Sequence, residues 1–147
     1  MKILNIIIPL LLLMPLTSDA QCRAFSKNRC LPQLNGYTQN DTYNSALLAP
    51  GDGVDQALTF YAGREYRLIV CAHPILGEVT FEVTDTHGEK IFEGVACSSS
   101  CENGKNKLDF KMTQTQQLII KIKVPKTDSE FMHEGCVTIM SGFKTTN

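Results

Sequence analysis

The sequence contains no tryptophan, and its 14 Lys and Arg residues nearly balance its 15 Asp and Glu residues. The formal net charge of −1 gives no electrostatic support to bulk binding of nucleic acid. Without tryptophan, an aromatic platform for sugars would depend on Tyr37, Tyr43 and Tyr61. Rings of this kind more often supply burial in a core or under a loop. Neither nucleic acid nor a tryptophan-based sugar platform is therefore expected.

Motifs for catalysis and for metal binding are also missing. No Gly-x-Ser-x-Gly segment forms a nucleophile elbow, and the serines at 98–100 are expected to be linker. His73, His87 and His133 share no spacing typical of a metal site. Asp52 and Asp55 match part of a calcium loop, but its terminal bidentate Glu is absent. We expect no metal and no cofactor, while a pair of carboxylates from distant strands stays open as a catalytic alternative.

The chain has one long apolar run, residues 3–16, which follows Lys2. This run is shorter than the roughly 20 residues that a membrane-spanning helix needs. Ser18 and Ala20 supply small residues at the −3 and −1 positions of a signal-peptidase site. We predict a signal peptide at 1–20, cleavage after Ala20, and a secreted or periplasmic protein without membrane insertion. Lipidation at Cys22 is disfavoured because the residues before it make a poor lipobox.

All six cysteines follow the predicted cleavage site, and an even number in an exported chain of this size predicts disulfides. Six cysteines allow 15 pairings. Chain entropy favours near pairs, so we expect Cys22–Cys30 and Cys97–Cys101, leaving Cys71–Cys136 to close a long loop. Zinc is the rival interpretation, but no second cysteine pair follows 97–101 at a zinc-ribbon distance.

Apolar and polar residues alternate along much of the chain, which is typical of strands with one buried face. At 65–72 both faces are apolar, which predicts a central strand that is covered on both sides. The expected inward-facing sets elsewhere are Val79, Phe81 and Val83; Leu108, Phe110 and Met112; and Leu118, Ile120, Ile122 and Val124.

Short polar connections at 62–64, 85–88 and 113–115 favour hairpins. Residues 21–56 are expected to be an irregular entry segment with one or two short strands and at most a short turn of helix. Together with 57–147 they should form one domain. The predicted fold is an all-β, antiparallel, Greek-key or jelly-roll-like sandwich of 7–9 strands, stapled by disulfides and preceded by a signal-peptide helix.

Residues 58–70 resemble the F-x-x-G-x-x-Y-x-[LI]-x-V segment of bacterial pre-peptidase C-terminal domains, and the turn at 85–88 resembles their Asp-x-x-Gly turn. The chain is also similar in layout to small exported bacterial proteins of uncharacterised role. The resemblance implies a Greek-key sandwich and a non-catalytic role, and it carries over no functional residues. We expect the chain to depart from the family in its six cysteines and as a free-standing domain without an attached peptidase.

A candidate basic patch arises if strands 107–112 and 118–124 are hairpin partners, because their polar faces would then adjoin. Such a patch could bind an acidic surface polymer, but a solvated sheet face whose lysines resist edge association is the favoured explanation, because the net charge is near zero. The patch would contain Lys107, Lys111, Lys121 and Lys123.

The function that these observations favour is a non-catalytic exported module that binds a protein or glycan at the cell envelope or outside the cell. Its expected binding loops are residues 31–55, 97–105 and 126–135. A secreted hydrolase and a peptidase-associated accessory or inhibitor domain are the two alternatives.

Overall fold

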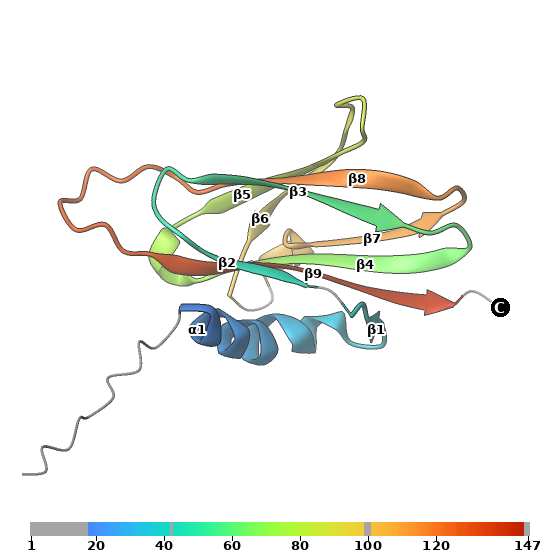
Figure 1. Cartoon of the computed structure of the whole chain (residues 1–147), viewed down its shortest axis with the longest axis horizontal. Coiled ribbons are helices and arrows are strands. Elements are labelled where there is room, and N and C mark those ends of the chain that lie inside the picture. The colour runs from blue at the N-terminus through green and yellow to red at the C-terminus, as the bar shows by residue number, and fades with distance from the viewer. Residues whose placement is uncertain (1–17, 42, 99–100, 146–147) are drawn as a thin grey trace, which may run out of the picture.

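The computed structural model describes residues 18–41, 43–98 and 101–145 of the chain. These residues form two antiparallel sheets packed face to face, with a helical segment on the outer side of one sheet (Figure 1). The predicted antiparallel β-sandwich is therefore confirmed. The apolar run of the predicted signal peptide lies outside the described residues, and the predicted cleavage point after Ala20 falls within the first helix. None of the described helices is long and apolar enough to cross a membrane.

The larger sheet, sheet A, has the order β1-β9-β4-β7, and β2 also pairs with β9. The smaller, sheet B, has the order β3-β8-β5-β6. Neighbours in each sheet are mostly far apart in sequence, as a Greek-key connectivity requires. Sheet A contains β1 (Thr38–Gln39), β2 (Asn44–Leu48), β4 (Arg64–Ala72), β7 (Lys107–Met112) and β9 (Gly135–Thr145). Sheet B contains β3 (Gly53–Phe60), β5 (Val79–Thr84), β6 (Lys90–Ala96) and β8 (Gln116–Lys123).

The inner faces of the two sheets form the main core, and the inward-facing sets expected from the alternation all contribute to it. Tyr66 anchors one end of this core. Its ring packs edge-to-face on Phe60 with 4.9 Å between centroids, and stacks on Phe110 at 5.7 Å. Its buried hydroxyl oxygen accepts a hydrogen bond from the backbone N–H of Tyr61 at 3.0 Å. Tyr66 therefore joins a strand of each sheet and satisfies its polar atom as it does so.

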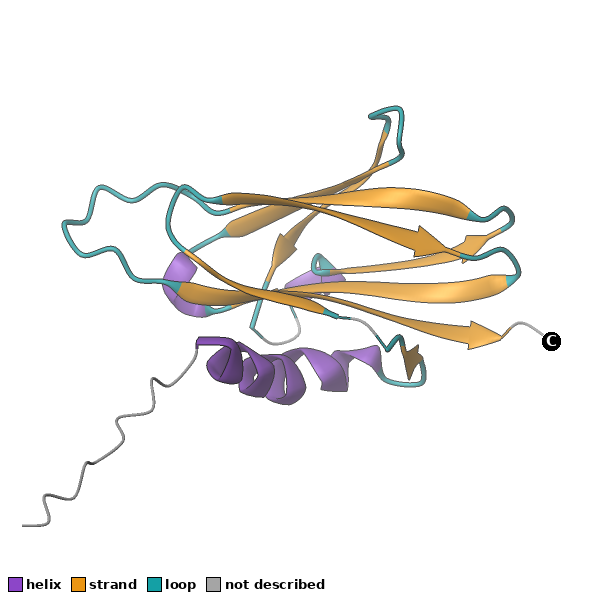
Figure 2. Cartoon of the chain, in the orientation of Figure 1, coloured by secondary structure: helices purple, strands orange, loops and turns teal. Residues whose placement is uncertain are grey.

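A helical layer covers the outer face of sheet A, where the sequence predicts only an irregular segment (Figure 2). It consists of α1 (Ser18–Phe25), η1 (Ser26–Cys30) and η2 (Leu31–Leu34). Its buried side chains recur at every fourth position, at Cys22, Ser26, Cys30 and Leu34. Strand β4 requires this cover, because Ile69 and Cys71 on its outer face are fully buried. Two further short helices, η3 (Pro74–Leu76) and η4 (Glu102–Gly104), lie in connections.

Two of the three predicted disulfides are wrong. The structure pairs Cys22 with Cys136 and Cys30 with Cys71, and only Cys97–Cys101 is as expected. The helical layer places Cys22 and Cys30 eight residues apart, or roughly 12 Å at the rise of a helix. That separation exceeds the reach of a disulfide of about 7 Å. Each cysteine instead bonds to a strand of sheet A, with Cα atoms 5.3 and 5.9 Å apart.

One of the three predicted hairpins is correct. β5 and β6 pair directly through the turn at 85–89. The connection at 61–63 instead leads from β3 in sheet B to β4 in sheet A, and the one at 113–115 leads from β7 in sheet A to β8 in sheet B. A short connection at the end of a sandwich can cross between sheets as readily as it can close a hairpin.

We expect the long-range disulfide Cys22–Cys136 and the local disulfide Cys97–Cys101 to differ in how much they stabilise the protein. In the chain-entropy account, a loop closed across 114 residues contributes about 5 kcal/mol and one across four residues about 2 kcal/mol. Cys22→Ser/Cys136→Ser should therefore lower the free energy of unfolding in urea by more than Cys97→Ser/Cys101→Ser does. Equal losses, or peptide maps that join Cys22 to Cys30, would contradict the tethering of the helical layer.

Gly94 lies where β6 approaches the connection before β7, and a Cβ atom there would meet the Lys105 carbonyl and lie 2.7 Å from the Phe81 ring. Gly94→Ala should therefore destabilise the protein by about 1–3 kcal/mol through overpacking. Gly53→Ala is the matched control in a strand, because the Cβ would make only an ordinary contact of 3.4 Å. Thermal unfolding of both variants checks this close approach, and a Gly94→Ala protein as stable as the control would refute it.

Candidate binding surface at the loop end

The four lysines of the predicted basic patch do not lie together. Lys107 and Lys111 belong to β7 in sheet A, and Lys121 and Lys123 belong to β8 in sheet B. Their side chains are on the outer faces of the two sheets, and these faces point in opposite directions. The prediction of a single patch is wrong because the connection between the two strands crosses from one sheet to the other.

Each pair of lysines also has acidic neighbours. Lys121 lies in register between Asp55 on β3 and Glu82 on β5. On sheet A, Lys111 lies opposite Glu65. Cross-strand pairs of opposite charge stabilise a solvated sheet face modestly. The outer strand faces are therefore mixed in charge, and neither forms a basic surface on its own.

Arg67 joins sheet A to the helical layer. Its guanidinium donates two hydrogen bonds to the Asp109 carboxylate, at 2.8 and 2.7 Å. It also donates to the carbonyl of Gln33 at 3.3 Å. The ring of Tyr37 lies between Arg67 and Lys144, whose cationic groups are 4.5 and 4.2 Å from its centroid. This arrangement is structural, and it leaves the Tyr37 ring enclosed rather than free to stack on a sugar.

Two carboxyl groups have lowered pKa values, and both have local partners. The hydrogen bond from Arg67 lowers the pKa of Asp109, against the opposing effect of burial. The backbone N–H groups of Glu89 and His87 hold the pKa of Asp85 below its ordinary value. A catalytic acid instead needs a raised pKa. These two carboxylates therefore stabilise the fold and give no support to the hydrolase alternative.

Asp52 and Asp55, the partial calcium motif, do not converge on one site. The Asp52 carboxylate accepts a hydrogen bond from the backbone N–H of Ala49 at 2.8 Å and so closes the turn before β3. Asp55 lies on the outer face of sheet B beside Lys121. Across the described part of the chain, no three His, Cys, Asp or Glu side chains are grouped so as to hold a metal ion.

One end of the sandwich, which we call the loop end, is formed by residues 49–52, helix η3 and the connection 124–134 between β8 and β9. This connection projects beyond both sheets (Figure 1). Phe131 and Met132 on it are 73% and 68% exposed, and Ile75 on η3 is 47% exposed. A pocket of about 240 Å³ lies at this end, lined in part by Pro50, Ile75, Leu76, Pro125 and Phe131. Of the three predicted binding loops, 126–135 lies almost entirely at the loop end. Loop 31–55 contributes only residues 49–52 to the loop end as defined.

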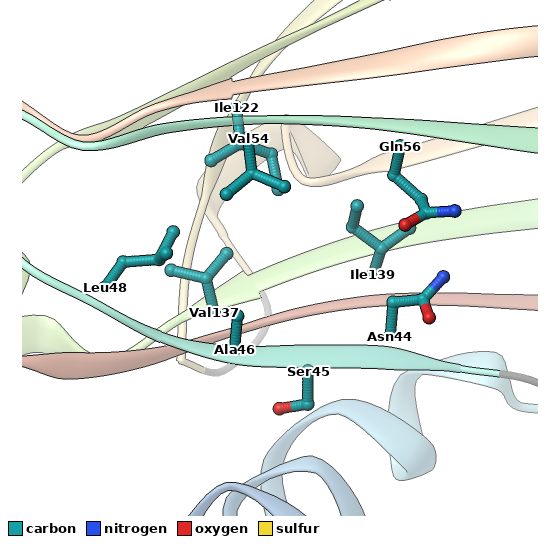
Figure 3. A pocket seen from close by; sticks show the side chains of 9 residues that line it. All are labelled: Asn44, Ser45, Ala46, Leu48, Val54, Gln56, Ile122, Val137 and Ile139. Carbon is teal, nitrogen blue, oxygen red and sulfur yellow. The ribbon is translucent and has the colours of Figure 1, made fainter.

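A groove opens beside the loop end, between the edge strands β2 and β3 (Figure 3). It has a volume of about 220 Å³, and its floor is aliphatic, with Leu48, Val54, Ile122, Val137 and Ile139. The amides of Asn44 and Gln56 stand at its rim, one from each sheet. Ala46 on the edge strand also lines this groove, which the sequence pattern alone does not reveal.

Comparisons with known proteins identify no family. No family model matches the chain, and no curated protein matches it. Among solved structures, a periplasmic inhibitor of g-type lysozyme from Aeromonas hydrophila is 10% identical with a TM-score of 0.48, covering 74% of this chain and 89% of its own. The CBM36-1 domain of a multidomain xylanase from the hindgut metagenome of Trinervitermes trinervoides is 12% identical with a TM-score of 0.32, covering 76% and 93%. The resemblance to pre-peptidase C-terminal domains stays a prediction.

The Arg67–Asp109 pair predicts a pH dependence of stability. Because the pKa of Asp109 is lower in the folded protein, its contribution is present above the unfolded pKa and is lost as pH falls through the folded pKa. Asp109→Asn should therefore lower the free energy of unfolding at pH 7 by at most about 1 kcal/mol, since Asp109 is half exposed. The difference from wild type should vanish in acid. Asp128→Asn, in the exposed connection, is the control, and a difference for Asp109→Asn that persists unchanged at pH 2 would contradict this account.

Proposed function

We propose that this chain is an exported, non-catalytic module that binds another protein through the loop end. The observation that carries the proposal is the projecting connection at 124–134, which holds Phe131 and Met132 in solvent. Phenylalanine and methionine are enriched at the centres of protein interfaces. Each contributes about 1.5–3 kcal/mol when it moves from water into a fitting site.

Neighbouring groups extend this apolar surface into one that fits a protein partner. Ile75 adds a third exposed apolar side chain, and Phe131 and Ile75 line the same pocket. A projecting connection of this kind suits a concave apolar site on the partner. The inhibitor alternative is the special case in which that concave site is a catalytic cleft.

The tyrosines favour a protein over a glycan as the partner. Tyr37 lies between two cations. Tyr43 packs against a second core beneath the helical layer, formed by Cys30, Leu34, Ile69, Cys71 and Met140. Tyr61 is exposed, but it follows the end of β3 that is remote from the loop end. The three rings therefore do not gather into the platform that sugar binding requires, whereas the exposed apolar side chains of the loop end do gather.

Export is supported by the position of the disulfides. Cys22 lies two residues beyond the proposed cleavage site and bonds to Cys136 in sheet A. Disulfides of this structural kind form in oxidising compartments such as the periplasm or the extracellular space. Cleavage after Ala20 would leave the Cys22–Cys136 disulfide intact at the start of the mature chain.

The test is capture of partners by the mature, oxidised protein from the native envelope and medium, followed by measurement of affinity with the purified partner. Phe131→Ser/Met132→Ser should weaken binding by about 150-fold or more, as expected when two side chains that each contribute at least about 1.5 kcal/mol are lost. Ile91→Ser/Tyr61→Ser is the matched control, because it removes two exposed apolar side chains away from the loop end. Its affinity should stay within twofold of wild type.

Unchanged thermal unfolding of both variants would show that the fold is intact. Equal affinity of the loop-end variant and the control would rule out the loop end as the binding surface. Capture of polysaccharide rather than protein, unaffected by the loop-end changes, would favour the glycan alternative instead.

A further inference from the structure

We propose that the pocket between the helical layer and the edge strands β1 and β2 binds a small organic anion with an apolar body. The pocket has a volume of about 330 Å³ and lies on a different face from the edge groove and the loop-end pocket. Its described lining residues are Arg23, Ala24, Lys27, Leu31, Gln39, Tyr43 and Met140. The proposal does not depend on the protein-binding function of the loop end.

The charge of this part of the chain favours an anion. Residues 20–40 contain Arg23, Lys27 and Arg29 but no Asp or Glu, although the whole chain has a net charge of −1. Among the described residues, the salt bridges involve neither Arg23 nor Lys27. Residues 20–34 of the helical layer therefore carry an excess of positive charge.

The spacing of the two cations directs both toward one ligand. Arg23 and Lys27 are four residues apart in a continuous helical segment, so their side chains lie on the same face, and both line the pocket. Like charges at this spacing repel each other. An anion between them would remove that repulsion, and the planar guanidinium of Arg23 can hold a carboxylate through two parallel hydrogen bonds.

The remaining lining selects the body of the ligand. Met140 is almost fully buried at the base of the pocket, and Leu31 and Tyr43 are partly buried and pack against the same second core. These side chains present an aliphatic and aromatic surface, with the amide of Gln39 as the additional polar group. A simple inorganic anion or a hydrophilic acidic sugar would leave this surface uncovered.

The volume limits the size of the ligand. A pocket of about 330 Å³ has room for roughly eleven water molecules, which is near the lower end of the range for small-molecule sites. A carboxylate with an aliphatic chain of about ten carbons is of this size. The chemical class is therefore a medium-chain or aryl carboxylate rather than a polymer or a membrane surface.

The experiment uses the mature, oxidised protein with 13C-methyl methionine, titrated with decanoate below its micelle concentration. The Met140 methyl signal should shift and saturate, while the Met112 and Met132 signals, which are remote from the pocket, should stay in place. Decanol should bind at least tenfold more weakly, because it lacks the charge. Galacturonate and inorganic phosphate should also bind at least tenfold more weakly, because they lack the apolar body.

Two double variants then test whether the positive charges at the pocket bind the carboxylate. Arg23→Gln/Lys27→Gln should weaken decanoate binding at least tenfold, whereas Lys121→Gln/Lys123→Gln removes the same charge from the outer face of sheet B and should change it less than twofold. Absence of a saturable Met140 shift, equal effects of the two variants, or galacturonate or phosphate binding as tightly as decanoate would each overturn the proposal. Equal binding of decanol would do so as well, since the cations would then contribute nothing.

Discussion

The structure depends on the burial of both faces of sheet A. On β4 the inward side chains pack into the main core, while Ile69 and Cys71 on the outer face are also fully buried. On β9 Met140 repeats the pattern. A strand of this kind cannot face water on either side. The helical layer supplies the missing cover, and two disulfides and the buried hydroxyls of Ser26 and Thr138, 2.7 Å apart, attach it to the sheet.

The sandwich itself could be predicted from the sequence, because strand alternation is a local property. The period-two pattern identified the inward residues of β5, β7 and β8, and the two-sided apolar pattern correctly indicated that β4 is covered on both faces. The helical layer escaped prediction because its buried side chains at 22, 26 and 30 are cysteine and serine, which do not form an obvious apolar stripe. Their spacing of four, continued by Leu34, is the signal that could have revealed it.

The disulfide pairing and the lysine patch failed for a different reason, since both depend on long-range geometry. Chain entropy favours near cysteines, but a helix separates Cys22 from Cys30 along its axis and turns both toward the sheet. The alternation of apolar and polar residues likewise shows which lysines face solvent, but it does not show to which sheet each lysine belongs. The short connection at 113–115 decides that question, and its residues are compatible with a hairpin and with a crossing between sheets alike.

These long-range constraints also determine how the loop end is presented. Two backbone hydrogen bonds fix the start of the projecting connection. The N–H of Val124 donates to the carbonyl of Asp52 at 2.9 Å, and the N–H of Gly51 donates to the carbonyl of Pro125 at 3.2 Å. It ends at Cys136, which bonds to the helical layer and accepts a hydrogen bond from the N–H of His73 at 2.8 Å. Anchoring at both ends reduces the conformational freedom that Phe131 and Met132 must lose on binding. The Cys22–Cys136 disulfide, one of the two that fasten the helical layer, therefore also holds one base of the proposed binding loop. The cover of sheet A and the presentation of the loop end share this bond.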